Sequence, residues 1–162
     1  MTGRVFSINI SGAKGERKKP VRSASLKEDF GILDDAHAGP GSRQVSLLAI
    51  EEIEKIESKR PSGDIEFQPG IFAENITTED VDLSRLKVGD KLLIGEAAVL
   101  CVSQIGKECP EPCRIGRSLG ECLMPKQGVF ATVAAGGAIK IHDRIRVVPQ
   151  RTGLWTKISS LK

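Results

Sequence analysis

Residues 91–105 read Lys-Leu-Leu-Ile-Gly-Glu-Ala-Ala-Val-Leu-Cys-Val-Ser-Gln-Ile, which is two apolar runs separated by a Gly-Glu turn. The pattern predicts a strand over Lys91–Ile94, a tight turn at Gly95-Glu96 and a second, longer strand over Ala97–Ile105. The alternation in the longer strand places Val99, Cys101 and Ile105 on one face. Cys101 lies within an apolar run, so we expect it to be a buried small side chain.

Other short strands lie on both sides of this pair. Phe6, Ile8 and Ile10 alternate with polar residues, and Gly136-Gly137 is a two-residue hairpin signal between two apolar segments. Strands are predicted over Val5–Ile10, Val21–Leu26, Val129–Ala134 and Ala138–Val148, with His142 on the polar face of the last one or at a bulge.

One segment has a clear helical period. Residues 46–59 carry an apolar stripe made by Leu47, Ile50, Ile53 and Ile56. Ser46 is suited to cap the start of this helix, and Glu51 and Lys55 form a favourable pair one turn apart. Asp82–Leu86 suggests a short helical turn.

These elements predict a mostly β fold. Seven or eight short strands with glycine-rich turns and no strand–helix–strand alternation favour a compact β-barrel, with one main covering helix at about 46–59 and short helical turns. The chain of 162 residues is long enough for one domain with a core, which we place at 1–150, followed by a C-terminal tail at 151–162.

Composition excludes several classes of protein. A hydrophobic content of 40% and a charged content of 28% are ordinary for a soluble globular protein, and no apolar run approaches the ~18 residues of a membrane helix. We see no signal peptide, so we expect a cytoplasmic protein without a membrane partner. The segment Lys14–Lys27 holds six basic residues and one acidic residue without aromatic neighbours. This favours a solvated loop, or a loop that contacts a phosphate-bearing small molecule, over nucleic-acid binding.

The segment Gly106–Phe130 carries three of the four cysteines, Cys109, Cys113 and Cys122. Cations lie close in the sequence at Lys107, Arg114 and Arg117, and nearby cations favour the thiolate form of a cysteine.

Two alternatives follow for these thiols. Pro110 and Pro112 keep Cys109 and Cys113 out of a helix, and the spacing of these two cysteines differs from the Cys-x-x-Cys of redox motifs. One alternative is a structural zinc held by Cys109, Cys113, Cys122 and a histidine. The other is a reactive thiol that ligates a soft metal or carries sulfur.

Candidate polar groups for a site lie outside the cysteine segment. His37 is in a loop rich in glycine and aspartate, Arg43 opens the next ordered segment, and Asn75 lies beside a predicted strand.

The chain resembles the MOSC domain, the molybdenum cofactor sulfurase C-terminal domain, in its short stand-alone bacterial type. The resemblance rests on an ordered set of motifs that covers nearly the whole chain from Gly3 to about Val148. The motifs are Asp35-Ala36-His37-Ala38-Gly39, Arg43-Gln44-Val45-Ser46-Leu47-Leu48, Gly70-Ile71-Phe72-Ala73-Glu74-Asn75-Ile76, Leu86-x-Val88-Gly89-Asp90, Ile94-Gly95, Pro112-Cys113 and Cys122-Leu123-Met124-Pro125-Lys126-Gln127-Gly128-Val129-Phe130.

The resemblance implies a barrel-like fold that binds the molybdenum cofactor or carries sulfur for its sulfuration or transfer. The thiol of the Pro-Cys motif is then Cys113, which larger members use to ligate molybdenum. His37, Arg43 and Asn75 would form the polar shell, and Lys18 and Lys19 would attract the pterin phosphate. Cys109 and Cys122 would add soft ligands or resolve a persulfide.

The resemblance leaves the activity open between sulfur carrier, sulfurtransferase, molybdenum-dependent enzyme and a module without chemistry. The expected partners are molybdopterin and its biosynthetic or acceptor proteins. A non-enzymatic zinc-binding or cofactor-insertion module is the alternative. Related short members often carry His directly after the first loop cysteine, where this chain has Pro110, so a site that used that imidazole would be lost.

Overall fold

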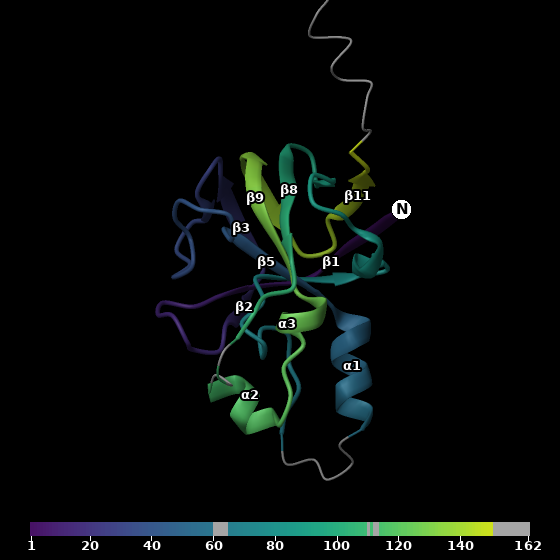
Figure 1. Cartoon of the computed structure of the whole chain (residues 1–162). Helices are drawn as coiled ribbons and strands as arrows, with labels where there is room; N and C mark the ends of the chain where they lie inside the picture. The colour runs from purple at the N-terminus through teal and green to yellow at the C-terminus, as the bar shows by residue number, and fades with distance from the viewer. Residues whose placement is uncertain (60–64, 110, 112–113, 151–162) are drawn as a thin grey trace, which may run out of the picture.

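The computed structural model describes residues 1–59, 65–109, 111 and 114–150. Its main feature is a closed barrel of seven strands in the order β11-β7-β8-β9-β5-β6-β1, in which the pairing of β1 with β11 closes the ring (Figure 1). The strands are β1 (Thr2–Ile10), β5 (Val45–Ala49), β6 (Ile76–Glu79), β7 (Lys91–Ile94), β8 (Ala98–Ile105), β9 (Val129–Ala135) and β11 (Arg144–Val148). The short β2 (Lys19–Val21) adds to β1 outside the ring. The predicted mostly β barrel is confirmed.

A small second sheet corrects the predicted hairpin at Gly136-Gly137. It consists of β10 (Gly137–Lys140), β3 (Ser23–Lys27) and β4 (Gly31–Ile32), so β10 pairs with β3 while β9 pairs with β8 and β5. Gly136 is needed for close packing rather than for a turn, because a Cβ there would lie 2.7 Å from the carbonyl oxygen of Leu26. The predicted strand 138–148 is also divided, by a turn in which His142 has φ 72°.

Helix α1 (Ile50–Ser58) is shorter at its start than the predicted helix at 46–59. Residues 45–49 instead form β5, which is buried along its whole length between β6 and β9. An apolar residue at position 47 fits both a helical stripe and a buried strand, and sheet pairing decides between them. Consequently Ser46 is not the cap, and the N-cap residue is Ala49, which makes no side-chain cap bond.

The rest of the helix prediction holds in part. Ile50, Ile53 and Ile56 form the buried face of α1, as the periodicity predicts. Lys55 pairs with Glu52 rather than with Glu51, because the Glu51 carboxylate accepts a hydrogen bond from the backbone N–H of Asp80.

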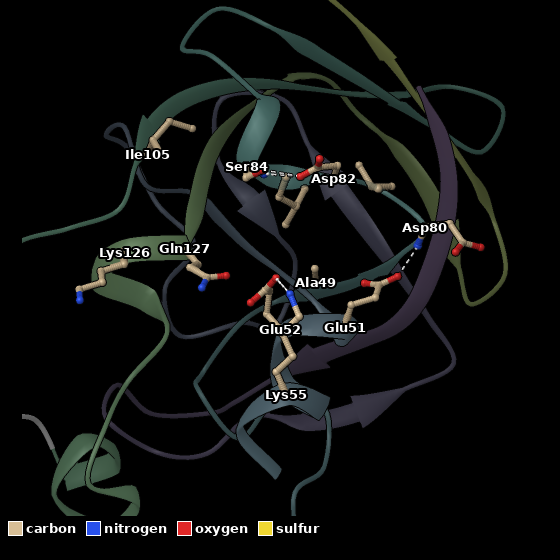
Figure 2. A pocket seen from close by; sticks show the side chains of 12 residues that line it. Ala49, Glu51, Glu52, Lys55, Asp80, Asp82, Ser84, Ile105, Lys126 and Gln127 are labelled. Atoms are coloured by element: carbon tan, nitrogen blue, oxygen red, sulfur yellow. Dashed lines mark hydrogen bonds and ion pairs between the residues drawn. The ribbon is translucent and has the colours of Figure 1, made fainter. Parts of the chain in front are cut away.

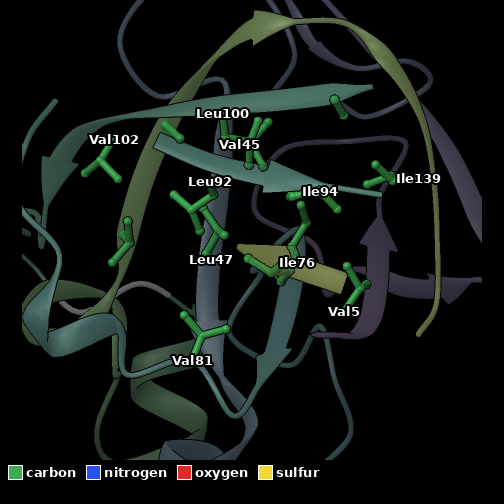
Figure 3. Packing of buried hydrophobic residues seen from close by; sticks show 14 of the residues in the cluster. Val5, Val45, Leu47, Ile76, Val81, Leu92, Ile94, Leu100, Val102 and Ile139 are labelled. Carbon is green, nitrogen blue, oxygen red and sulfur yellow. The ribbon is translucent and has the colours of Figure 1, made fainter. Parts of the chain in front are cut away.

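Two hydrophobic clusters hold the fold together. The larger fills the barrel with side chains from every strand of the ring, among them Val5, Leu47, Ile76, Leu92 and Leu100 (Figure 3). The second lies between α1, residues 71–72 and the segment 119–130, and contains Ile53, Phe72, Leu119, Met124 and Phe130.

Strand β8 corrects the prediction for Cys101. Ala98, Leu100 and Val102 point into the barrel, whereas Cys101 is half-buried on the other face. Both faces of this strand are apolar at its centre, so alternation alone did not identify the inner one.

The predicted cysteine loop contains two short helices, α2 (Arg114–Leu119) and α3 (Met124–Gln127). Leu119 and Met124 are buried in the second cluster, and this tertiary packing orders helices too short to form alone. The 3-10 helix η1 (Leu83–Arg85) confirms the predicted turn at Asp82–Leu86. In the part of the chain described, no helix has the length and apolar character needed to cross a membrane.

Candidate functional site

A cavity of about 560 Å³ gathers predicted site residues from separate parts of the chain. His37, Arg43 and Asn75 all line it. His37 and Arg43 belong to the loop that leads into β5, and Asn75 belongs to the turn before β6. Sequence reasoning did not identify the other lining residues as a group: Lys14, Pro40, Gly41, Ser42, Ser46, Phe72, Ala73, Lys107, Met124 and Phe130.

The cavity is basic. Lys14, Arg43 and Lys107 line it, and none of the described lining residues is an aspartate or a glutamate. The Arg43 guanidinium lies over the ring of Phe130, another lining residue, at 5.9 Å from its centroid, which is a cation–π contact. A cavity with this charge favours an anionic ligand. We name it the basic cavity.

A buried ion pair lies directly behind His37. Lys18 is 3% exposed, and its ammonium contacts the carboxylate of Asp35 at 2.6 Å and Nδ1 of His37 at 2.9 Å. Ser11 completes the network through its hydroxyl, 3.3 Å from Nζ, and its backbone N–H, which donates to Asp35. The second oxygen of Asp35 accepts from the backbone N–H of His37, so the carboxylate also fixes the turn that carries the imidazole.

The network shifts the pKa values of two of its members. Burial alone raises the pKa of Asp35, but hydrogen bonds from Lys18, Ser11 and Asn75 outweigh it, and the pKa lies below its ordinary value. Burial and the neighbouring charge of Lys18 lower the pKa of His37, and the opposing effect of Asp35 is smaller. His37 is therefore a neutral imidazole at pH 7.

Asn75 joins the cavity wall to the barrel. It is 1% exposed, and its Oδ1 accepts from the backbone N–H of Ser46 at 3.0 Å and from the Ser46 hydroxyl at 3.2 Å. Its Nδ2 donates to the carbonyl of Asn9 at 3.3 Å. The side chain thus ties β5 to β1, and its predicted contact with a ligand stays a prediction.

The turn before Asn75 is shaped by a buried carboxylate. Glu74 is fully buried and accepts from the backbone N–H of Gly70 at 2.6 Å, the backbone N–H of Phe72 at 3.1 Å and the hydroxyl of Thr77 at 3.0 Å. Burial raises its pKa, although these hydrogen bonds oppose the rise. A side chain at position 70 would not fit, because a Cβ there would lie 2.3 Å from the carbonyl oxygen of Lys18.

The predicted lysines lie away from the cavity surface. Lys18 is enclosed behind His37, and Lys19 is exposed on β2; neither lines the basic cavity. Their attraction for a phosphate stays a prediction.

The cysteines are only partly described. Cys113 falls outside the described residues, Cys109 is exposed, and Cys122 is half-buried against the second cluster. Within the described ranges, no three His, Cys, Asp or Glu side chains are grouped so as to hold a metal ion. Because Cys113 is not described, the soft-metal and zinc alternatives both stay predictions.

A larger cavity of about 750 Å³ lies elsewhere and has a different character. It is bounded by α1, the 80–84 turn and α3, and none of the predicted site residues lines it (Figure 2). Three of its four carboxylates have a local partner: Glu51 accepts from the backbone N–H of Asp80, Glu52 pairs with Lys55, and Asp82 accepts from Ser84. The second oxygen of Glu51 is buried without a hydrogen-bond partner among the described residues. Four acidic and two basic residues line it, so it does not suit an anionic cofactor: Glu51, Glu52, Asp80, Asp82, Lys55 and Lys126.

Comparison with known proteins identifies the family. No protein with a curated description matches the sequence. The crystal structure of YuaD from Bacillus subtilis has a TM-score of 0.74 at 20% identity, over 93% of this chain and 98% of that one. YiiM from Escherichia coli gives 0.69 at 19% identity, over 95% of this chain and 73% of that one. YiiM from Geobacillus stearothermophilus gives 0.67 at 20% identity, over 93% and 77%.

These likenesses show a shared fold. The family follows from the sequence itself, because the model of the MOSC domain matches residues 34–146. That range includes His37, Arg43, Asn75 and Cys113, and it is more than half of the chain. The protein belongs to the MOSC domain family.

Proposed function

We propose that this molybdenum-cofactor-related protein binds the cofactor in the basic cavity, through the phosphate of the pterin. The observation that supports the proposal is the charge of the cavity: Lys14, Arg43 and Lys107 supply three cations, and no carboxylate is among its described lining residues. Such a donor set fits a phosphate, which lysine and arginine bind through charge-assisted hydrogen bonds.

The proposal gives Cys113 the chemical role, as a ligand of molybdenum or as a carrier of sulfur. The segment with Cys113 is flanked in the sequence by Lys107 and Met124, and both of these line the cavity. Cations beside a thiol favour the thiolate, which is the form that binds soft metals and takes part in sulfur transfer. When bound, the cofactor would supply the redox or sulfur chemistry of molybdenum.

The first prediction concerns the thiol. Protein purified from cells that make the cofactor is expected to carry molybdenum and pterin, and Cys113→Ser is expected to lose most of the molybdenum, because a hydroxyl is a poor ligand for a soft metal. The measurement is metal analysis by mass spectrometry together with pterin fluorescence. Cys101→Ser is the matched control, since Cys101 is half-buried on β8 and does not line the cavity.

Equal metal in the wild type and in Cys113→Ser would contradict the role of Cys113. About one zinc per chain, lost with thermal stability on chelation, would favour the zinc-binding module instead. Cofactor binding that persists in Cys113→Ser would favour a cofactor-insertion module.

The second prediction concerns the cations. Arg43→Ala/Lys107→Ala is expected to weaken binding of a phosphate monoester by about a hundredfold or more, because each of two charge-assisted hydrogen bonds contributes roughly 1.5–3 kcal/mol. Calorimetric titration with phenyl phosphate measures the loss. Lys55→Ala/Lys126→Ala is the control, because it removes two cations from the other cavity and has the same net charge as Arg43→Ala/Lys107→Ala. Equal weakening in both variants would mean that net charge, not the basic cavity, attracts the anion.

A further inference from the structure

The ammonium of Lys18 is saturated by its neighbours. An ammonium group has three N–H donors and no acceptor. Three partners surround this one: Asp35 Oδ1 at 2.6 Å, His37 Nδ1 at 2.9 Å and Ser11 Oγ at 3.3 Å. The side chains of Lys18 and Asp35 are 1% and 0% exposed, so water does not replace any of these partners.

The contact with Lys18 determines the protonation of His37. Since the ammonium can only donate, Nδ1 of His37 must accept and carries no proton. The neutral ring then has its proton on Nε2. An imidazolium would bring an N–H of its own against the ammonium, would lose the hydrogen bond and would place two positive charges side by side.

Most of the charged groups around His37 disfavour its imidazolium. Among the described residues, Lys18, Lys14 and Lys107 act against the charged ring, whereas Asp35 favours it. Asp35 already has four hydrogens directed at it, from Lys18, Asn75 and the backbone N–H groups of Ser11 and His37. The low pKa of His37 is consistent with this balance.

We propose that the buried Lys18–Asp35 pair holds His37 as a neutral Nε2–H donor, which makes the basic cavity a site for fully deprotonated oxyanions. The inference rests on the proposed function, because it concerns the ligand of the same cavity. Lys14, Arg43, Lys107 and His37 each offer donors, and no described lining residue offers a carboxylate to accept a proton from the ligand. A phosphate monoester then binds as the dianion, and sulfate or molybdate fits the same donors. Lys18 is a positioning residue, and His37 touches the ligand.

The state of the imidazole can be tested without a ligand. The chain has two histidines, so nitrogen-15 and carbon-13 histidine labelling gives two ring systems, and His142→Gln assigns them. We expect His37 to show the Nε2–H tautomer at pH 8 and at pH 7, and to be still mostly neutral at about pH 6.5, where an ordinary histidine is half charged. The Nδ1–H tautomer, or an imidazolium at pH 7, would overturn the inference.

The ligand class is tested by calorimetric titration between pH 5 and pH 7. Phenyl phosphate is expected to bind about tenfold more tightly per pH unit up to its second ionisation near pH 6 and then to level off. Sulfate, which has no proton to lose in this range, is expected to bind equally at every pH. Sulfate affinity that rises on acidification would show a charged His37 and would overturn the inference.

Two substitutions test the donor itself. Gln places an amide nitrogen near the position of Nε2, so His37→Gln is expected to keep affinity for sulfate within about threefold, whereas His37→Leu is expected to lose about tenfold or more. If the wild type binds an oxyanion and His37→Leu binds it equally tightly, the inference is overturned and the proposed function stands. Absence of any oxyanion binding by the wild type overturns the proposed function and with it the role of His37 as a ligand donor, while the tautomer is decided separately by the spectra.

Discussion

Lys18→Met is expected to lower the free energy of unfolding by about 3–5 kcal/mol, because it leaves a carboxylate buried without its counter-ion. Asp35 is enclosed, and Lys18 is its nearest cation at 2.6 Å. Urea denaturation at pH 7 measures the loss. Lys19→Met is the matched control, since the neighbouring lysine is exposed on β2 and its substitution is expected to stay within about 0.5 kcal/mol of the wild type.

The double variant Lys18→Met/Asp35→Asn identifies the cause. Replacing both members removes the unpaired charge, so we expect it to recover most of the stability lost in Lys18→Met. Because the pKa of Asp35 is lowered in the folded state, its stabilisation is present above the ordinary value of 3.8 and is lost as the pH falls through the lower folded value. A Lys18→Met protein within 1 kcal/mol of the wild type at pH 7 would contradict the importance of the pair.

Glu74→Ala is expected to cost about 3–5 kcal/mol, because it leaves the N–H groups of Gly70 and Phe72 and the hydroxyl of Thr77 buried without their acceptor. The turn they hold leads into Asn75, so we also expect weaker oxyanion binding. Glu54→Ala, at an exposed position on α1, is the control and is expected to change stability by less than about 0.5 kcal/mol.

Glu74→Gln separates the charge of this side chain from its shape. The pKa of Glu74 is raised in the folded state, so its contribution is fully present below the ordinary value of 4.5 and is lost as the pH rises through the higher folded value. Glutamine does not titrate, and the difference in unfolding free energy between the two proteins should therefore move in favour of Glu74→Gln between pH 4.5 and pH 8. A difference that stays constant over this range would contradict the raised pKa.

The sequence was most informative where local pattern and packing agree. Three elements were predicted because the local sequence pattern of each fits a single type of structure. They are the strand Lys91–Ile94, the short helical turn at 83–85 and the buried face of α1. The start of the helix was wrong because Leu47 satisfies two periods, and its place between β6 and β9 depends on residues distant in the chain. The hairpin predicted at Gly136-Gly137 was wrong because a glycine can be required for close packing as well as for a turn. The two requirements are distinguished only by the contacts in the fold.

The site was predicted as residues rather than as an arrangement. His37, Arg43 and Asn75 were candidates from their local sequence and from the family motifs, and the structure brings them to one cavity. Lys18 was predicted to attract the pterin phosphate, but the structure buries it against Asp35 and Ser11, which are distant in the chain from one another. Lysine is rarely buried, so its sequence position did not predict this pairing. Cys113, the residue with the proposed chemistry, lies outside the described residues, so its place relative to the cavity stays a prediction.

The closure of the barrel by β1 and β11 has a consequence for synthesis of the chain. Thr2 pairs with Arg146, so β1, the first strand of the barrel in chain order, must wait for β11, the last one. At about 5–20 residues per second, roughly 7–30 seconds separate the two strands. During that interval the β1 edge that β11 will occupy is open, although β2 and β6 can already pair with β1. The ring therefore completes late, and an unpaired edge of this kind is a place where nascent chains associate wrongly or recruit chaperones.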